Sequence, residues 1–306
     1  MRVLITGGTG FLGRSLCARL AQEGHGVTVV TRSIGSTDET LAANKKIFLL
    51  QGNPMEPGDW QEAIKNQNVL INLAGASIFS KWSDRQKRRI RESRLRTTRR
   101  IVEGIDGGKA RPVTLINASA IGYYGFHQDE ELDEKSPPGG DFLAGVCRDW
   151  EAEALRAADK GARVVLMRSG IVLGEKGGAL GIMVRFFKLF IGGPLGSGRQ
   201  WFSWIHLRDW VRAIVFLIDQ PEISGPVNLC TPNPVRNKEL ARALGKALHR
   251  TAFMPAPAFA VRLILGEFGN LVLKGQRVVP RRLLDRKFDF QYPEIEGALE
   301  DILAKK

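Results

Sequence analysis

The chain opens with MRVLITGGTGFLG, residues 1–13, and this stretch decides the fold class. Arg2–Thr6 is a short apolar run of the kind that forms a buried strand, and apolar residues recur at helical spacing over Phe11–Glu23. A glycine-rich turn joins the two. A strand, a glycine turn and an amphipathic helix in this order predict a βα unit at the start of the chain. The turn glycines are Gly7, Gly8, Gly10 and Gly13.

The same alternation of strand and helix patterns continues through the first half of the chain. The expected helices lie at 58–66, 83–107 and 143–159. Nearly continuous apolar strands that alternate with helices predict a parallel sheet covered on both faces. We therefore expect an α/β fold: a Rossmann-type parallel sheet with helices on both faces plus a smaller C-terminal lobe. The later strands are expected at Gly26–Thr31, Ile47–Leu50, Val69–Leu73, Val113–Ala118 and Val164–Met167.

The composition excludes several classes of protein. Of the 306 residues 43% are hydrophobic and 25% charged, which is ordinary for a globular chain and not for a disordered one. No run of about 18 uncharged apolar residues occurs, so we expect no membrane span. The N-terminus does not read as a secretory signal, and Cys17, Cys147 and Cys230 are widely spaced, which together predict a reducing, cytoplasmic location. The histidines form no ligand pattern, so no metal site is expected.

Positive charge is concentrated in one segment. The net charge is +13, and residues 81–100 hold ten lysines and arginines against Asp84 and Glu92. This segment can be a solvated helix face, a phosphate-binding surface for a nucleotide cofactor, or a surface for nucleic acid. No groove-reading motif accompanies it, so a nucleic-acid partner is the least favoured of the three. We expect a monomer or a homodimer. Pairing through this segment is disfavoured, because the cationic helix would repel the same helix of a second copy.

The glycine turn predicts a dinucleotide site. Glycines let the backbone approach a pyrophosphate closely, and free N–H groups at the start of the following helix hold the phosphate charge. The alternative is a glycine-rich turn without a ligand. The residues expected to contribute are Gly7, Thr9, Gly10, Phe11, Leu12 and Gly13.

The end of the second strand indicates which dinucleotide is bound. NAD sites usually carry an acidic residue there that binds the ribose 2′-hydroxyl. This chain instead has Thr31 and Arg32, and its first carboxylate after that strand is Asp38. A guanidinium suits a 2′-phosphate through charge-assisted hydrogen bonds, so the sequence predicts NADP(H) rather than NAD(H). The alternative is an ordinary surface arginine.

A further candidate contact follows the fourth strand. Leu73, Ala74 and Gly75 come directly after Asn72 at the expected carboxyl edge of the sheet. Open α/β sheets bind ligands at that edge, and small residues allow a ligand to approach the backbone. The alternative is simple packing at the end of a strand.

The chain is similar to the extended short-chain dehydrogenase/reductase superfamily through TGGTGFLG (6–13), NLAG (72–75) and the strand that ends at Asn117–Ala120. Other motifs resemble one branch, the NADP-dependent epimerase-family proteins with a C-terminal domain of unknown function. Together these motifs cover nearly the whole chain. The branch motifs are Ser93–Thr98, Ser119–Gly125, Trp150-Glu151, Arg168–Gly174, Gly196–His206 and Lys274–Arg282.

The resemblance implies a Rossmann-type domain that binds NADP(H) and a smaller lobe that closes over the nicotinamide. It implies that the glycine turn, Arg32 and Leu73-Ala74 touch the cofactor, and that Arg94 faces it from a helix. From Gly177 to Trp210 glycines and aromatic residues become more frequent, which predicts a loop-rich region with one amphipathic stretch near Met183–Ile191. The expected divisions are 1–175 for the NADP(H)-binding domain, rejoined by a strand near 226–230, and 176–306 for the substrate-binding lobe, with a C-terminal module at about 250–304.

The chain departs from the superfamily at the catalytic motif. The usual chemistry needs a tyrosine and a lysine four residues later, because the ammonium lowers the phenol pKa and lets the phenol exchange a proton while hydride moves. Ser119, which would orient the reacting oxygen, is present. The expected helix at 140–151 contains neither tyrosine nor lysine.

Three interpretations remain open. In the first, the protein is an NADP(H)-dependent oxidoreductase or epimerase-like protein that acts on an unknown small molecule, with a phenol from Tyr123 or Tyr124 and a cation such as Arg148 or Arg168. In the second, it binds NADP(H) without turnover, as a regulatory or sensor protein. In the third, Cys147 serves as the acid or base, although a free cysteine is commonly just buried.

The second lobe offers three candidate substrate residues. Trp201 and Trp204 are suited to line an apolar cavity, or to pack between the lobes. His206 could donate a proton near neutral pH, or could start a helix and bond to its backbone.

Overall fold

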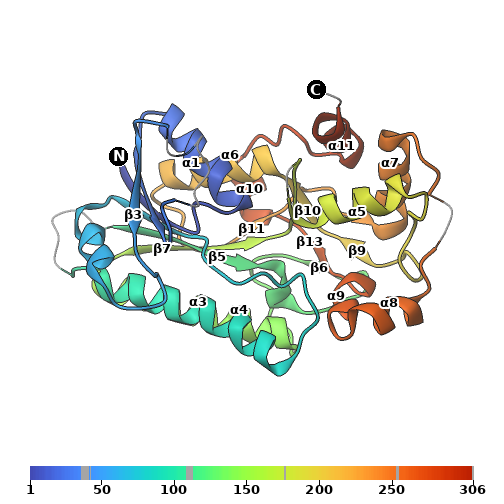
Figure 1. Ribbon diagram of the computed structural model, residues 1–306, viewed down its shortest axis with the longest axis horizontal. Helices are drawn as coiled ribbons and strands as arrows, with labels where there is room; N and C mark the ends of the chain where they lie inside the picture. The colour runs from blue at the N-terminus through green and yellow to red at the C-terminus, as the bar shows by residue number, and fades with distance from the viewer. Residues whose placement is uncertain (36–40, 42, 108–112, 176, 253–254, 305–306) are drawn as a thin grey trace.

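A seven-stranded parallel sheet forms the centre of the molecule (Figure 1). The computed structural model describes residues 1–35, 41, 43–107, 113–175, 177–252 and 255–304. The strand order is β11-β7-β5-β4-β1-β2-β3, and every neighbouring pair is parallel. This confirms the expected fold class. The strands are β1 (Arg2–Thr6), β2 (Gly26–Thr31), β3 (Ile47–Gln51), β4 (Val69–Asn72), β5 (Thr114–Ala120), β7 (Arg163–Ser169) and β11 (Gly225–Leu229).

Helices cover both faces of the sheet because its strands are apolar on both faces. In β1, Val3 and Ile5 enter one core cluster, whereas Leu4 enters the cluster on the opposite face. The first cluster is covered by α1 (Phe11–Gln22), α6 (Leu207–Asp219) and α10 (Arg281–Asp285). The second is covered by the 3₁₀ helix η1 (Asp59–Asn66), α3 (Asp84–Gly104) and α4 (Phe142–Leu155).

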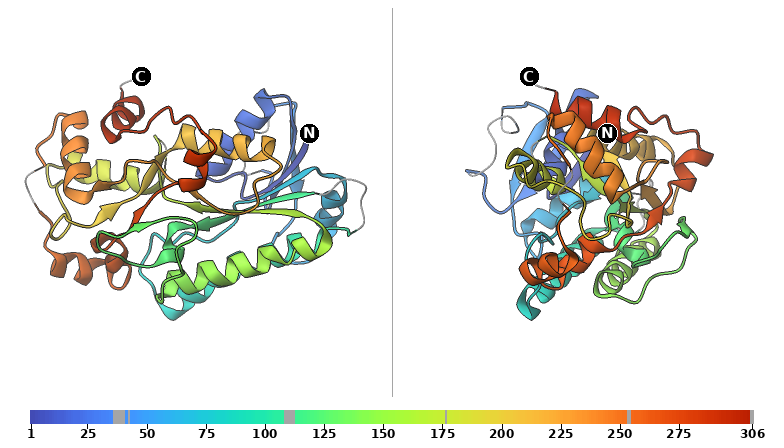
Figure 2. Two further views of the ribbon diagram at one scale, coloured as in Figure 1. Left: turned by 180° about the vertical axis from the view of Figure 1, so that it is seen from behind. Right: turned by 90° about the vertical axis from the view of Figure 1, so that its right-hand side faces the viewer.

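A smaller region lies beside the carboxyl edge of the sheet, at the end of the molecule away from β3 (Figures 1 and 2). Its core contains buried residues of α5, α7, α11 and of the short strands. The paired strands are β8 (Ile171–Leu173) with β10 (Trp204–His206), β9 (Trp201–Phe202) with β12 (Val235–Arg236), and β13 (Arg277–Val278) with β6 (Glu131–Leu132). The helices of this region are η2 (Ile121–Tyr124), α5 (Gly178–Lys188), α7 (Asn237–Leu248), α8 (Ala258–Leu265), α9 (Phe268–Leu273) and α11 (Ile295–Leu303). The short helix η3 (Ala158–Lys160) lies outside it, between α4 and β7 beside the end of α3.

Two local expectations are corrected. The loop-rich region predicted up to Trp210 is wrong from Leu207 onward, where α6 begins. Its cap is the His206 side chain, the helix-start role that the sequence left open for this residue. The helix expected to reach 159 ends at Leu155, and η3 follows it after a short break. Among the described residues, no helix is long and apolar enough to cross a membrane.

Asp209 ties α6 to the C-terminal segment. Its side chain is fully buried and accepts hydrogen bonds from the backbone N–H groups of Gln291 (3.0 Å) and Tyr292 (2.8 Å). Arg212, one turn further along α6, donates to it as well at 3.1 Å. One carboxylate thus satisfies two backbone donors and one face of the Arg212 guanidinium, which also donates to the Asp289 carbonyl at 2.7 Å.

Replacing Asp209 with alanine should lower the free energy of unfolding by about 2–4 kcal/mol, because two backbone donors lose their acceptor and the Arg212 guanidinium loses the buried one of its two carboxylates. The matched control is Asp289→Ala, which removes an exposed carboxylate from the same arginine and should cost about 0.5 kcal/mol or less. Urea unfolding of the three proteins measures the difference. Equal midpoints for the two variants would contradict the anchoring role.

Candidate functional site

The glycine turn lies against the end of β4. Gly7 has φ +75°, and a Cβ there would stand 2.8 Å from the Leu73 carbonyl carbon and 2.9 Å from the Ala74 nitrogen. A Cβ at Gly13 would overlap the Gly7 carbonyl oxygen. Glycine is therefore required sterically at both positions. The contact brings the glycine turn and the Leu73–Gly75 segment, predicted separately from the sequence, to one place.

The start of α1 points free backbone donors at this place. Gly10 precedes the helix in an extended conformation, and no side chain caps it. The first N–H groups of an α-helix have no acceptor within the helix, so those of Phe11, Leu12 and Gly13 are available to a phosphate. The Arg14 side chain donates to the Thr9 carbonyl at 2.7 Å and holds the loop in shape.

At the end of β2, Thr31 and Arg32 take different positions. Thr31 is buried and its hydroxyl donates to the Ser33 carbonyl at 3.2 Å. Arg32 is exposed, and within the described part of the chain its guanidinium has no hydrogen-bond or ion-pair partner. Asp38 lies outside the described residues. An arginine without a protein carboxylate is what a 2′-phosphate site requires.

Arg94 is the inward-facing cation of α3. Its Nη1 donates to the carbonyl oxygens of Ile90 (2.9 Å) and Ala76 (3.1 Å), and its guanidinium lies 5.1 Å from the centre of the Trp150 ring. A Cβ on Gly75 would stand 3.1 Å from Arg94 Cζ. Burial lowers its pKa, and no carboxylate of the described residues pairs with it. Arg94 thus offers an uncompensated positive charge beside the predicted cofactor contacts.

The other cations of α3 are largely neutralised by neighbours. Five of them form ion pairs with acidic residues. Two of these acidic residues, Asp149 and Glu153, lie on α4, and Glu56 lies just before η1. The segment is therefore an ion-paired helix face and not a bare cationic stripe. The pairs are Lys87–Glu267, Arg91–Asp149, Arg96–Glu56, Arg99–Glu153 and Arg100–Glu103.

A buried polar network fixes the ends of the central strands. Asn72 of β4 accepts from the Thr6 hydroxyl (2.7 Å) and donates to Asn117 of β5 (2.7 Å) and to Thr98 of α3 (2.8 Å). The indole N–H of Trp150 also donates to Thr98, at 2.8 Å. Three strands and two helices are thereby held in one register at the edge where a ligand would lie.

Ser119 is joined to a buried ion pair. Its hydroxyl donates to Glu151 Oε1 at 2.6 Å. The Arg168 guanidinium on β7 donates two hydrogen bonds to the same carboxylate, at 2.9 Å to Oε1 and 2.8 Å to Oε2. All three side chains are buried. Because the carboxylate is paired and hydrogen-bonded on both oxygens, Ser119 is held in one orientation.

The two candidate phenols are placed very differently. Tyr124 is fully buried; its hydroxyl donates to Asn228 (2.7 Å) and accepts from Arg168 (3.1 Å), and burial raises its pKa. A phenol so enclosed packs the interior and does not reach a substrate. Tyr123 is half-buried, with its ring 3.5 Å from the Arg168 guanidinium carbon, and its hydroxyl has no partner among the described residues.

Cys147 does not suit acid/base chemistry. The side chain is buried in α4, and burial raises the pKa of its thiol to about 12. A thiol with that pKa stays protonated near neutral pH and is a poor nucleophile and base. Arg148, the other nearby candidate cation, is exposed and its Nε lies 3.9 Å from Asp149.

The three candidate residues of the second lobe are separated. Trp204 is fully buried and packs within the core of the second lobe, so its ring is not accessible to a substrate. His206 is also buried and accepts the Arg208 N–H at the start of α6, as the structural alternative predicts. Trp201 is half-buried; its N–H donates to Asp129, and the Arg236 guanidinium lies 3.8 Å from its ring centre.

Comparison with known proteins identifies the family. Residues 3–230 match the NAD dependent epimerase/dehydratase family, and residues 256–302 match a domain of unknown function, DUF1731. The chain belongs to the NAD dependent epimerase/dehydratase family. The epimerase family protein SDR39U1 homolog, chloroplastic, of Arabidopsis thaliana is 42% identical over 99% of this chain and 87% of its own length.

Two further relatives extend the likeness within this epimerase family. The epimerase family protein YfhF of Bacillus subtilis is 37% identical over 100% of this chain and 99% of its own. The crystal structure of human epimerase family protein SDR39U1 (isoform 2) with NADPH superposes with a TM-score of 0.87, at 33% identity and full coverage of both chains. These matches confirm the family resemblance drawn from the motifs.

Two site features of this family member were missed from the sequence. The Glu151–Arg168 pair joins residues far apart in sequence, and the motifs that contain them gave no sign of the contact. Glu134, in an acidic run that reads as exposed, is buried and accepts from the Asn228 and Arg282 backbone N–H groups. Burial raises its pKa. Among the described residues, no cluster of His, Cys, Asp and Glu could hold a metal ion.

His206 should make folding stability pH-dependent. Burial lowers its pKa below the usual 6.5, even though Asp301 lies 3.2 Å away and opposes the shift. The folded state therefore binds this proton less readily than the unfolded chain, and its contribution to stability is present above pH 6.5 and lost as pH falls through the lowered pKa.

The test is His206→Asn, which keeps a capping oxygen for Arg208 N–H and removes the titration. Wild type should lose stability more steeply than the variant between about pH 7 and pH 5 in urea unfolding. Superimposable pH profiles would show that His206 titrates alike in the folded and unfolded states.

Proposed function

We propose that this chain binds NADP(H) across the carboxyl edge of its sheet. The pyrophosphate lies at the start of α1 over Gly7–Gly13, and Leu73–Gly75 and Arg94 line the central part. Arg32 takes the 2′-phosphate. The observation that carries this proposal is the exposed Arg32, which lacks a partner in the described residues and follows β2 where a carboxylate would select NAD. The NADPH-bound human relative supports it.

The function best supported is that of an NADP(H)-dependent oxidoreductase or epimerase-like protein acting on a small molecule. When bound, the cofactor supplies or accepts hydride. Ser119, oriented by Glu151, positions the reacting oxygen. Tyr123 is the phenol that exchanges the proton, since its hydroxyl is unengaged among the described residues and its ring rests on the Arg168 guanidinium. In this proposal Arg168 is the cation beside the phenol, the position that lysine has in the usual motif.

The second lobe supplies the rest of the site in this proposal. Residues 1–175, with β11, form the cofactor domain, and 176–306 form the lobe that closes over the nicotinamide. Trp201 is the substrate-facing residue of the three candidates, because it alone keeps part of its ring exposed. Trp204 and His206 support it by packing behind β9 and capping α6.

A second candidate function is a regulatory protein that holds NADP(H) without turnover. The observation in its favour is that Tyr124 and Cys147 are buried with raised pKa values, so neither titrates near neutral pH. Only the behaviour of Tyr123 separates the two functions, because both use the same cofactor site.

Arg32→Asp should weaken NADPH binding about 10- to 100-fold, because charge-assisted hydrogen bonds to the 2′-phosphate are replaced by repulsion. NADH binding should change far less. Fluorescence titration of both cofactors measures this, with Arg89→Asp on the exposed face of α3 as the control for the change in net charge. Equal NADPH affinity in wild type and Arg32→Asp would reject the assignment.

Tyr123→Phe should leave NADPH affinity intact and slow hydride transfer about 10²- to 10⁴-fold, the usual contribution of a positioned acid or base. Tyr124→Phe is the matched control, expected to act through stability alone. The readout is NADPH oxidation, or NADP⁺ reduction, across a panel of aldehydes, quinones and nucleotide sugars. If wild type binds NADPH but turns over no member of the panel, the regulatory function is favoured.

A further inference from the structure

Large apolar side chains gather on the end of the molecule formed by the second lobe. On α8, Phe259, Leu263 and Ile264 are 73%, 79% and 64% exposed. On and after α5, Phe186, Leu189 and Ile191 are exposed as well, Leu189 by 67%. We call these six residues the end patch. A chain without a partner rarely leaves so many large apolar side chains in water.

The two parts of the end patch are joined through the backbone. Leu195 and Ala256 form a parallel bridge, with hydrogen bonds from Gly196 N to Ala256 O (2.8 Å) and from Ala256 N to Pro194 O (2.9 Å). This bridge follows Ile191 by four residues and precedes α8 by two. Figure 1 and the left view of Figure 2, both with the long axis horizontal, place α5 and α8 at the same end of the molecule, opposite β3.

The charges that flank the end patch are of one sign. Residues 176–208 and 240–266 contain no aspartate or glutamate. Arg185, Lys188, Arg250 and Arg262 are exposed within these segments. None of the four forms an ion pair with another described residue. An apolar patch bordered by cations is complementary in charge to an anionic surface.

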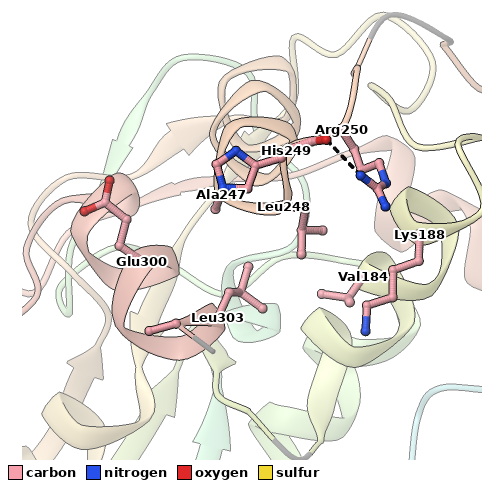
Figure 3. A pocket seen from close by; sticks show the side chains of 9 residues that line it. Val184, Lys188, Ala247, Leu248, His249, Arg250, Glu300 and Leu303 are labelled. Atoms are coloured by element: carbon pink, nitrogen blue, oxygen red, sulfur yellow. Dashed lines mark hydrogen bonds between the residues drawn. The ribbon is translucent and has the colours of Figure 1, made fainter. Parts of the chain in front are cut away.

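The nearest acidic groups do not cancel this charge. Glu267, which follows α8, is paired with Lys87. Glu300 lines a cavity of about 710 Å³ between α5, α7 and α11. In that cavity Lys188 and Arg250 stand on one side, while the Glu300 carboxylate points away on the other (Figure 3).

We propose that the end patch docks on the surface of an anionic lipid bilayer. The apolar side chains enter the boundary between headgroups and acyl chains, and the four cations contact the phosphate headgroups. Helix α8 has eight residues and α5 has eleven, so they lie on the membrane and do not cross it. A second copy of this chain fits less well, because its cations would meet cations. This inference does not rest on the proposed function.

Sedimentation with lipid vesicles tests the proposal on the full chain. Wild type should bind vesicles of phosphatidylcholine mixed with phosphatidylglycerol, bind pure phosphatidylcholine much less, and dissociate as salt is raised. The double variant Phe259→Ser, Leu263→Ser should bind at least about tenfold more weakly. Arg185→Gln and Lys188→Gln should each cost about fivefold. These end-patch side chains are exposed, so the variants should fold, which thermal unfolding checks.

The matched control is Phe48→Ser on β3, which removes a phenyl group 60% exposed at the opposite end of the molecule and should leave vesicle binding unchanged. Failure of wild type to bind anionic vesicles overturns the proposal, and so does equal binding by the double variant. A concentration-dependent dimer in light scattering that the double variant abolishes would also overturn it, since the end patch would then be a contact between copies.

Discussion

The buried Glu151–Arg168 pair is the interaction on which the arrangement of side chains around Ser119 depends. Arg168 is on β7 and Glu151 on α4, so their two hydrogen bonds fasten a covering helix to the sheet. Ser119 of β5 donates to the carboxylate, and both tyrosines of η2 contact the guanidinium. Removing either partner of such a pair leaves a buried charge uncompensated, which commonly costs about 3–5 kcal/mol.

A second polar network performs the same task at the cofactor end. Asn72, Asn117 and Thr98 join β4, β5 and α3 behind the Leu73-Ala74 segment that Gly7 touches. Parallel strands place their carboxyl ends at one edge, but they do not by themselves set the height of each loop above it. The asparagine side chains do so, because each has donors and an acceptor that must be satisfied when buried.

The sheet was predictable from the sequence because local signals carried it. Near-continuous apolar strands and the glycine turn act over a few residues, and they gave the strands with boundaries close to those observed. The burial of Glu134 was not predictable, because it depends on Asn228 and Arg282, which are far away in the chain. The His206 cap of α6 is local, and the sequence left it open beside a proton-donor role. Likewise Arg168 could be suggested as a cation, but only the fold brings Glu151, Ser119 and Tyr123 to it.

The helix that lacks the usual dyad changes what kind of chemistry the site can do. In α4 the thiol of Cys147 stays protonated, and Glu151 is bound by Arg168 and Ser119. Charge around Ser119 is therefore held in an ion pair. In the proposed oxidoreductase, a proton that moves with hydride would pass through a hydroxyl outside that pair. Tyr123 is half-buried beside that pair, with its ring 3.5 Å from the Arg168 guanidinium carbon, so the same ion pair that fastens α4 to the sheet also positions this phenol.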